Sequence, residues 1–365
     1  MKILLFAMRV KHKKFFLNLK KESPDSFDIV HTRDVLSISL KGYKDIKKVN
    51  FTSAVDFGIE EFIVKTNLKI PKVLLSFYFN KMAILTYFRY YRLIDEKYDY
   101  ILLWNGGKYR QRIAIEIARI KKVKPLFYEN GLLPNRMVLD RKGINFENSV
   151  PRNRAFFEAY KNLQELPQTL IPRKAKNREK FQETAEKLPE NFIFVPFQVD
   201  SDTQIITNSD WIKNMRMLFS LIEKLSLSCD YNFVLKEHPS SSQNYLDLHK
   251  KSKSLKSISF ANGYPTQELI EKSLAVITIN STVGIESLLF KKRVMVLGDA
   301  FYTIDGITKG ISSYEMLLDT LENLDSWKFE EQLVENFLKY LYYDYLIPND
   351  EHIYKNFFKF IQGEL

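Results

Sequence analysis

The chain has 365 residues, 45% of them hydrophobic, with one cysteine and a net charge of +11. These values predict two globular domains and exclude an internal disulfide or a cysteine-rich metal cluster. Its apolar runs stay below the roughly 20 residues that span a bilayer, its short apolar start lacks a signal-peptide cleavage site, and no nucleic-acid-binding module accompanies the positive charge. We therefore expect a cytoplasmic protein without a nucleic-acid partner.

The first half of the chain is predicted to be an α/β domain. Its expected elements are strands at 2–8, 28–31 and 49–51, a helix at 70–96, a strand at 98–104, a helix at 109–120 and a strand at 124–128. The last strand delivers Glu129, Asn130 and Gly131 to its carboxyl end, the edge at which open α/β sheets bind ligands. Glu129 also fits a turn or helix-cap carboxylate.

A segment with little periodicity, residues 129–157, follows and contains Arg152. A long polar loop after a strand is uncommon unless it is functional. Pro167, Pro172 and Pro189 punctuate the next stretch, so we place the linker near 188–191. The expected domains are therefore 1–190 on the acceptor side and 191–335 on the donor side, with helices of 336–365 packing back on the first domain.

The second half is predicted to contain a parallel sheet covered on both faces, because its strands are continuous apolar runs. Strands are expected at 192–197, 231–236, 257–260, 274–279 and 293–297, and helices at 210–225, 266–272, 283–290, 313–323, 329–343 and 352–362. With the first domain this gives an α/β, GT-B-like architecture of two Rossmann-like domains with a cleft between them.

The turn Asn280-Ser281-Thr282 ends one of these strands and precedes a helix. Ser281 or Thr282 can cap that helix, whose free N–H groups then form a site for an anion. Glu286 lies four residues past Thr282 on the same helix face, where it can reach a ribose hydroxyl. An ordinary capped βαβ unit with a surface glutamate fits the same residues.

Further polar residues follow two other strands of this sheet. Gln198, Asp200 and Asp202 come after the first strand, and Lys236 and His238 end the next one. Lys236 and His238 place hydrogen-bonding and positive groups beside a phosphate site. A solvated turn for the aspartates and a structural histidine remain the alternatives.

These motifs together resemble the bacterial capsule-synthesis family of retaining β-Kdo glycosyltransferases, over about residues 100 to 300. The resemblance rests on the stretches 129–131, 139–145, 149–152, 198–202, 236–239, 280–282 and on Glu286. It implies transfer of Kdo from CMP-β-Kdo to a glycan or lipid-linked glycan acceptor in capsule, O-antigen or related polysaccharide synthesis. It implies no metal and no cofactor beyond this donor.

Roles for individual residues follow from the same resemblance. Asp202 matches the position of the nucleophile best, Asp200 is the reserve candidate, and Glu129 is the acid/base. His238 is the fourth catalytic candidate; it and Lys236 would neutralise the phosphate leaving group or hold the Kdo carboxylate. The resemblance assigns the remaining positions to binding: Asn280, Ser281 and Thr282 at the phosphate, Glu286 at the ribose, Gln198 and Arg152 at the sugar, with Asn130 and Gly131 beside Glu129.

Three alternatives stay open: a sialyltransferase-like CMP-sugar enzyme, a polyol-phosphate transferase, and a non-enzymatic nucleotide- or glycan-binding protein. Polyol-phosphate transferases often use a second histidine as base, and His12 and His31 lie too early in the sequence for us to place them at a catalytic strand end. The basic charge, with 20 Tyr and 28 Phe, is compatible with peripheral contact at the inner face of the cytoplasmic membrane or with a polysaccharide-assembly complex.

Overall fold

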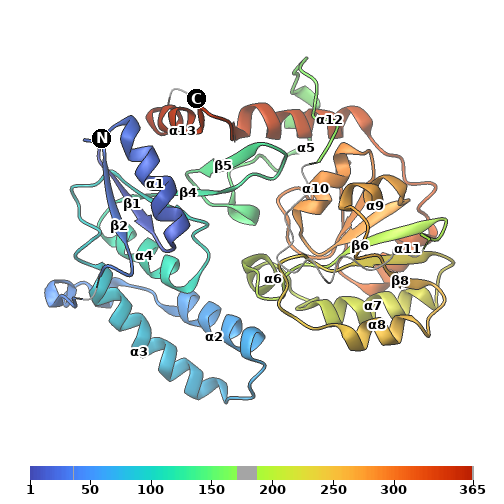
Figure 1. The fold of residues 1–365 in the computed structure, drawn as a ribbon, viewed down its shortest axis with the longest axis horizontal. Coiled ribbons are helices and arrows are strands. Elements are labelled where there is room, and N and C mark those ends of the chain that lie inside the picture. The colour runs from blue at the N-terminus through green and yellow to red at the C-terminus, as the bar shows by residue number, and fades with distance from the viewer. Residues whose placement is uncertain (36, 171–186, 364–365) are drawn as a thin grey trace. The chain divides into compact units, whose positions relative to one another are not determined.

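The computed structural model describes residues 1–35, 37–170 and 187–363. Its contacts divide the chain into two compact units (Figure 1). Unit 1 comprises Met1–Gly131, Asn135–Ser149 and Leu346–Leu365, and unit 2 comprises Leu132–Pro134 and Val150–Tyr345. Each unit is built around a six-stranded sheet.

The sheet of unit 1 has the strand order β12-β5-β4-β3-β1-β2. Four strands run parallel: β1 (Ile3–Ala7), β2 (Phe27–His31), β3 (Tyr100–Trp104) and β4 (Lys124–Asn130). Strands β5 (Arg136–Asp140) and β12 (Leu346–Pro348) extend the sheet by antiparallel pairing. The carboxyl ends of the four parallel strands therefore share one edge, which we call the unit 1 edge.

Helices cover both faces of this sheet. On one face, α1 (Val10–Glu22) packs against α13 (Ile353–Gln362), and their apolar side chains join those of Ile3, Leu5 and Ala7 in one core. On the other, α2 (Thr52–Thr66), α3 (Lys72–Tyr90) and α4 (Tyr109–Ile120) contact one another. Short 3-10 turns at Leu40–Gly42 (η1), Ile46–Lys48 (η2) and Asn145–Glu147 (η3) complete the unit.

Unit 2 contains an all-parallel sheet with the order β11-β10-β9-β6-β7-β8. Its strands are β6 (Phe192–Pro196), β7 (Asn232–Lys236), β8 (Ile258–Phe260), β9 (Ala275–Thr278), β10 (Arg293–Val296) and β11 (Lys309–Gly310). We call the shared carboxyl-end side the unit 2 edge; the candidate donor-site residues follow β6, β7 and β9 there.

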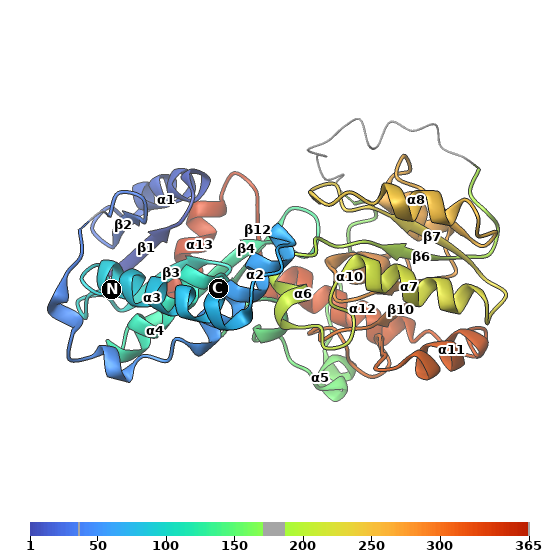
Figure 2. The same ribbon diagram turned by 90° about the horizontal axis from the view of Figure 1, so that it is seen from below.

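Two helical layers cover the unit 2 sheet (Figure 2). The layer on one face consists of α7 (Met215–Ser226), α8 (Leu246–Ser252) and α11 (Tyr314–Glu322). The layer on the other consists of α9 (Thr266–Lys272) and α10 (Thr282–Leu289), with α12 (Glu331–Lys339) packed on α10. The short helices α5 (Arg154–Ala159) and α6 (Thr203–Thr207) and the π-helical turn Tyr340–Tyr345 complete it.

The two parallel-rich sheets confirm the predicted α/β class with two Rossmann-like domains, while the cleft between them stays a prediction. Two local predictions are wrong. Residues 49–51 form no strand, because Phe51 is the N-cap of α2. Residues 129–157 are not one irregular loop, because the buried run 136–140 forms β5 against β4.

The contacts divide the chain at 149/150 and 345/346, whereas the sequence suggested 190/191 and 335/336. The reason is local: Phe157 of α5 is fully buried and contacts Phe337 of α12 at 5.2 Å between ring centroids, which joins α5 to unit 2. In the described residues, no helix has the length and apolarity needed to cross a membrane.

Candidate active site

Gln198 and Asn280 tie two strand ends together at the unit 2 edge. Gln198 Nε2 donates to Asn280 Oδ1 at 3.0 Å, and the backbone N of Asn280 donates to Gln198 Oε1 at 3.1 Å. Asn280 Nδ2 also donates to the carbonyls of Gln204 and Asn208, at 3.1 and 2.9 Å. Because both side chains are buried, their hydrogen bonds shape the turn from inside.

The residues after Asn280 begin helix α10. Ser281 is the N-cap, and its Oγ accepts from Val283 N at 3.2 Å. Tyr302, fully buried beneath the turn, donates to the Ser281 carbonyl at 2.6 Å. Thr282 starts the helix and Glu286 follows one turn later, both half-buried. This places a capped helix N-terminus at the unit 2 edge, where it can attract an anion.

Asp200 is buried and held at both oxygens. Its Oδ1 accepts from Met215 N, the first residue of α7, at 2.7 Å, and its Oδ2 accepts from the Tyr245 hydroxyl at 2.9 Å. Burial raises the pKa of Asp200, and these two hydrogen bonds oppose that rise. The arrangement makes Asp200 an anchor between the β6 end and α7.

Asp202 has a different environment. It is exposed and forms the N-cap of α6, with Oδ1 accepting from Gln204 N at 2.9 Å. As the N-cap, Asp202 holds its carboxylate at the start of α6 on the unit 2 edge, where the carboxylate stays accessible to solvent. Of the two aspartates, Asp202 is therefore the one that a substrate can reach.

Lys236 and His238 follow β7 on the same edge. Lys236 Nζ donates to the carbonyls of Asn262 and Tyr264 at 2.7 and 2.6 Å, and burial lowers the pKa of this lysine to about 8. The Nδ1 atom of His238 accepts from Ser240 N at 3.1 Å. A neutral His238 therefore carries its proton on Nε2, which suits donation to an anionic oxygen.

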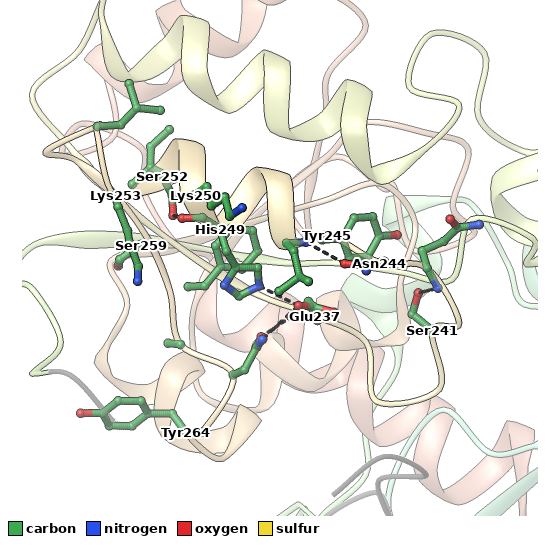
Figure 3. A pocket seen from close by; sticks show the side chains of 18 of the residues that line it. Glu237, Ser241, Asn244, Tyr245, His249, Lys250, Ser252, Lys253, Ser259 and Tyr264 are labelled. Atoms are coloured by element: carbon green, nitrogen blue, oxygen red, sulfur yellow. Dashed lines mark hydrogen bonds and ion pairs between the residues drawn. The ribbon is translucent and has the colours of Figure 1, made fainter. Parts of the chain in front are cut away.

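A cavity of about 1150 Å³, lined by polar and apolar side chains, lies beside this loop (Figure 3). At its wall the buried Glu237 accepts from Asn262 Nδ2 at 3.1 Å and contacts His249 Nε2 at 2.7 Å. The His249 ring stacks on Phe260 with centroids 3.9 Å apart. The sequence analysis included Glu237 in the stretch 236–239 without assigning it a role. It missed His249, because α8, which carries this residue, was not predicted.

At the unit 1 edge, Asn105 orients Glu129. Asn105 Nδ2 donates to Glu129 Oε2 at 2.9 Å, while its own Oδ1 accepts from Gly107 N at 3.0 Å. Asn105 holds this geometry with a positive φ of 70°, a conformation that asparagine tolerates well. Glu129 is half-buried at the end of β4, and Asn130 beside it is exposed.

Gly131 and Asp140 shape the chain after Glu129. A Cβ atom on Gly131 would lie 1.9 Å from the Arg136 carbonyl oxygen, so the close approach of the hairpin requires glycine. Asp140 is buried, and its oxygens accept from Lys142 N at 2.6 Å and Ser149 N at 2.7 Å. Both residues have structural reasons for their positions.

Arg152, the last predicted site residue, lies in unit 2. Its guanidinium lies 5.4 Å from the centre of the Phe301 ring and donates to the Val150 carbonyl. The structure thus brings the predicted residues of the second half together along the unit 2 edge, with Arg152 beside Phe301. Glu129, Asn130 and Gly131 belong to unit 1.

His12 and His31, which the sequence analysis did not place at a catalytic strand end, both lie close to strand ends in unit 1. His31 is the last residue of β2, and His12 lies in the first turn of α1, after β1. The His12 ring stacks on Trp104, the last residue of β3, with centroids 4.7 Å apart. Burial lowers the pKa of His12 to about 4. Parallel pairing brings these early residues to the unit 1 edge.

No group of three or more His, Cys, Asp or Glu side chains is arranged to hold a metal in the part of the chain that the structure describes. Asp200 and Asp202 do not form a pair there, since the first faces Tyr245 inside the unit and the second caps α6 at the surface. The expectation of a reaction without a metal stays a prediction.

Comparison with known proteins places the chain among capsule polysaccharide proteins. Residues 159–347, more than half of the chain, match the family model for "Capsule polysaccharide biosynthesis protein". Protein FixF of Sinorhizobium fredii is 35% identical over 250 residues, which cover 68% of this chain and 60% of FixF. The capsule polysaccharide modification protein LipB of Neisseria meningitidis is 29% identical over 127 residues, which cover 32% of this chain and 30% of LipB. The chain thus spans less than two thirds of either relative.

Among solved structures, a KpsC β-Kdo 2,7 transferase from Thermosulfurimonas dismutans aligns with 99% of this chain and 100% of its own, at 15% identity and a TM-score of 0.48.

Proposed function

The chain belongs to the capsule polysaccharide biosynthesis protein family, and from this premise we propose that it is a retaining β-Kdo glycosyltransferase that uses CMP-β-Kdo. One observation carries the proposal. The unit 2 edge combines the capped N-terminus of α10, the Lys236–His238 loop and the accessible carboxylate of Asp202. An anion site next to a nucleophilic carboxylate is the arrangement that a nucleotide-sugar donor with one phosphate needs.

In this proposal the donor is held by its phosphate and ribose. Backbone N–H groups at the start of α10 and the Ser281 and Thr282 hydroxyls bind the phosphate, and Glu286 binds the ribose hydroxyls. His238 and Lys236 stabilise the negative charge that develops on the phosphate as the sugar leaves. Asn280 and Gln198 support the turn through their mutual hydrogen bonds, so we now assign them positioning roles.

Transfer proceeds in two displacements. A carboxylate oxygen of Asp202 attacks the anomeric carbon of Kdo, a glycosyl ester bond forms, and the bond to the phosphate oxygen breaks so that CMP leaves with the electron pair. An acceptor hydroxyl then attacks the same carbon, displaces Asp202 and gives its proton to Glu129. Two inversions preserve the configuration. Asn105 positions Glu129 through the 2.9 Å hydrogen bond.

The acceptor is a glycan or a lipid-linked glycan of capsule, O-antigen or a related surface polysaccharide, and the reaction takes place in the cytoplasm. A donor with a single phosphate leaves less charge to neutralise than a diphosphate, and fixed cationic and N–H groups serve that purpose. The proposed mechanism therefore uses no metal.

A second candidate, polyol-phosphate transfer, is favoured by one observation: His12 and His31 lie at the unit 1 edge. The sequence analysis disfavoured this reaction because it placed no histidine base at such a strand end. His12, however, is buried with its pKa lowered to about 4, which makes it a weak base. We therefore rank this reaction second.

Nucleotide release from a donor panel tests the proposal. We would incubate the protein separately with CMP-Kdo generated in situ, CMP-sialic acid and CDP-glycerol, and measure the CMP formed. CMP formation from CMP-Kdo alone, abolished in Glu286→Gln, supports the proposal. Preference for CMP-sialic acid or CDP-glycerol assigns the corresponding alternative, and no release from any donor, with donor integrity verified, points to a binding protein.

A further inference from the structure

Helix α3 is apolar on the face that packs into unit 1 and also on the face that it turns to solvent. Leu75, Ala83 and Tyr87 are buried against the unit. On the opposite side, Val73, Phe77 and Ile84 share one stripe, because they are spaced by four and seven residues along the helix. A helix that is apolar all round is normally covered on every side.

The exposed side chains form one concentrated group. Leu68, Val73, Leu74, Phe77 and Tyr78 are between 53% and 76% exposed, within a stretch of eleven residues at the turn from α2 into α3. α2 ends at Thr66, its C-cap Asn67 has a left-handed conformation, and α3 starts after Pro71, which makes this turn the tip of a helical hairpin (Figure 1). Single exposed apolar residues are ordinary, but a contiguous group marks an interaction surface.

The charged residues of the segment that carries this group have one sign. Between Asn67 and Arg92 the sequence contains five basic residues and no acidic residue. Lys72 pairs with Glu60 of α2 at 2.8 Å. Lys69 and Lys81 form no ion pair within the described residues, and Lys81 Nζ lies 5.4 Å from the centre of the Phe77 ring. We call these basic and apolar residues of 68–84 the α3 patch.

A second group of the same character lies at the other end of α3. Ser39 N donates to the Phe88 carbonyl at 3.1 Å and the Tyr87 hydroxyl donates to the Gly42 carbonyl at 2.8 Å, which holds η1 against the helix. Leu40 and Tyr43 in this segment are exposed. Lys41 and Lys44 alternate with them in the sequence.

We propose that the α3 patch, together with η1, docks this protein on an anionic lipid membrane. Aliphatic and aromatic side chains at the hairpin tip enter the boundary between headgroups and acyl chains, while the lysines bind lipid phosphates. Lysine stems are long enough to lie along the apolar surface with their ammonium groups at the headgroups. The α3 patch thus combines the positive charge and the exposed apolar side chains that binding to an anionic membrane requires.

The same charge argues against a second copy of the chain as the occupant. A two-fold dimer formed through this surface places the patch against itself, which would bring Lys69 and Lys81 towards like charges, while Glu60 already pairs with Lys72. The docking inference does not depend on the proposed Kdo transfer. If both hold, the surface brings the enzyme to an acceptor carried on a membrane lipid.

Vesicle sedimentation tests the inference. We would use vesicles of phosphatidylcholine alone and vesicles with about one third phosphatidylglycerol, and compare wild type with the double variant Phe77→Ser/Tyr78→Ser and with Lys69→Glu/Lys81→Glu. The matched control is Leu163→Ser/Leu227→Ser, which alters two leucines of unit 2 that are 99% and 79% exposed. All six side-chain changes lie at exposed positions, so folding is preserved and is checked by circular dichroism.

We expect wild type and the control to bind the anionic vesicles about tenfold more tightly than either patch variant, with binding weakened by salt. Equal binding by all four proteins, or preference for neutral vesicles, overturns the proposal. So does a dimer that Phe77→Ser/Tyr78→Ser converts to monomer while wild type ignores vesicles, since the patch would then be a protein interface.

Discussion

Asp200 and Asp202 lie two residues apart after β6, yet one is buried between Met215 N and the Tyr245 hydroxyl while the other is an exposed helix cap. The environment thus separates two carboxylates that the sequence ranked only through a family resemblance. Asp200 has both oxygens occupied by internal donors. Asp202 keeps one carboxylate oxygen available at the surface, which supports its proposed role as nucleophile.

This difference predicts stability effects of different size for the two amide variants. Asp202→Asn should change the free energy of unfolding by less than about 0.5 kcal/mol, because asparagine caps helices as well as aspartate. Asp200→Asn should lower the free energy of unfolding by about 1–3 kcal/mol. The new amide oxygen can accept from only one of the two buried donors, and the amide NH₂ group then faces the other. Urea unfolding of both variants measures the difference, and equal values would contradict the assignment.

Asn280 is predicted to stabilise the turn before α10 and not to bind the donor directly. Asn280→Ala removes donors to the carbonyls of Gln204 and Asn208 and strands the Gln198 amide in a buried site. We expect a loss of about 2–4 kcal/mol in unfolding free energy. Ser281→Ala, which removes a cap hydroxyl only, should cost about 1 kcal/mol. An Asn280→Ala protein with wild-type stability and weakened donor binding would instead make Asn280 a direct ligand.

Donor binding should weaken at alkaline pH, because Lys236 loses its positive charge there. Burial lowers the pKa of this lysine to about 8, so its charge is present at pH 7 and is lost as the pH rises through 8. The KM for the donor should therefore rise about tenfold from pH 7 to pH 9.

Lys236→Arg supplies the control, because its guanidinium stays charged throughout this range. Its KM should remain nearly constant between pH 7 and pH 9, whatever its absolute value. A wild-type rise that persists unchanged in Lys236→Arg would assign the pH dependence to another group.

His12 should make the protein sensitive to acid. Its folded pKa, lowered by burial to about 4, lies below the unfolded value, so the unfolded state binds more protons and stability falls as the pH drops from about 6.5 towards 4. Between pH 7 and pH 5 the loss from this residue is about 2 kcal/mol.

His12→Phe removes the titrating group while an aromatic ring remains to pack on Trp104. Urea unfolding at pH 7 and pH 5 should show a smaller acid loss in this variant than in wild type. Parallel losses in the two proteins would show that His12 does not control acid sensitivity.

The local sequence pattern predicted correctly those helices, strands and turns whose formation depends mainly on their own residues. The helix at 109–120 has the predicted bounds, because Ile113, Ala114, Ile117 and Ala118 place one apolar face at helical spacing against the sheet. The strand, turn and helix around Asn280 also follow from an apolar run and a cap. These features located the unit 2 edge.

Features that depend on distant partners were not predictable in the same way. β5 pairs with β12, which lies some two hundred residues later in the chain. His12 reaches the unit 1 edge because β1 pairs with β3, and nothing near His12 in the sequence records that pairing. Likewise, only the folded contacts with Met215 and Tyr245 show that Asp200 is an anchor.

The mass of the intact protein after incubation with CMP-Kdo, without acceptor, tests the central claim most directly. We predict a Kdo-sized adduct on wild type and on Asp200→Asn, and no adduct on Asp202→Asn, because Asp202 forms the glycosyl ester. An adduct that persists in Asp202→Asn and disappears in Asp200→Asn would make Asp200 the nucleophile. CMP release without any adduct, with rapid quenching, would contradict the two-displacement mechanism.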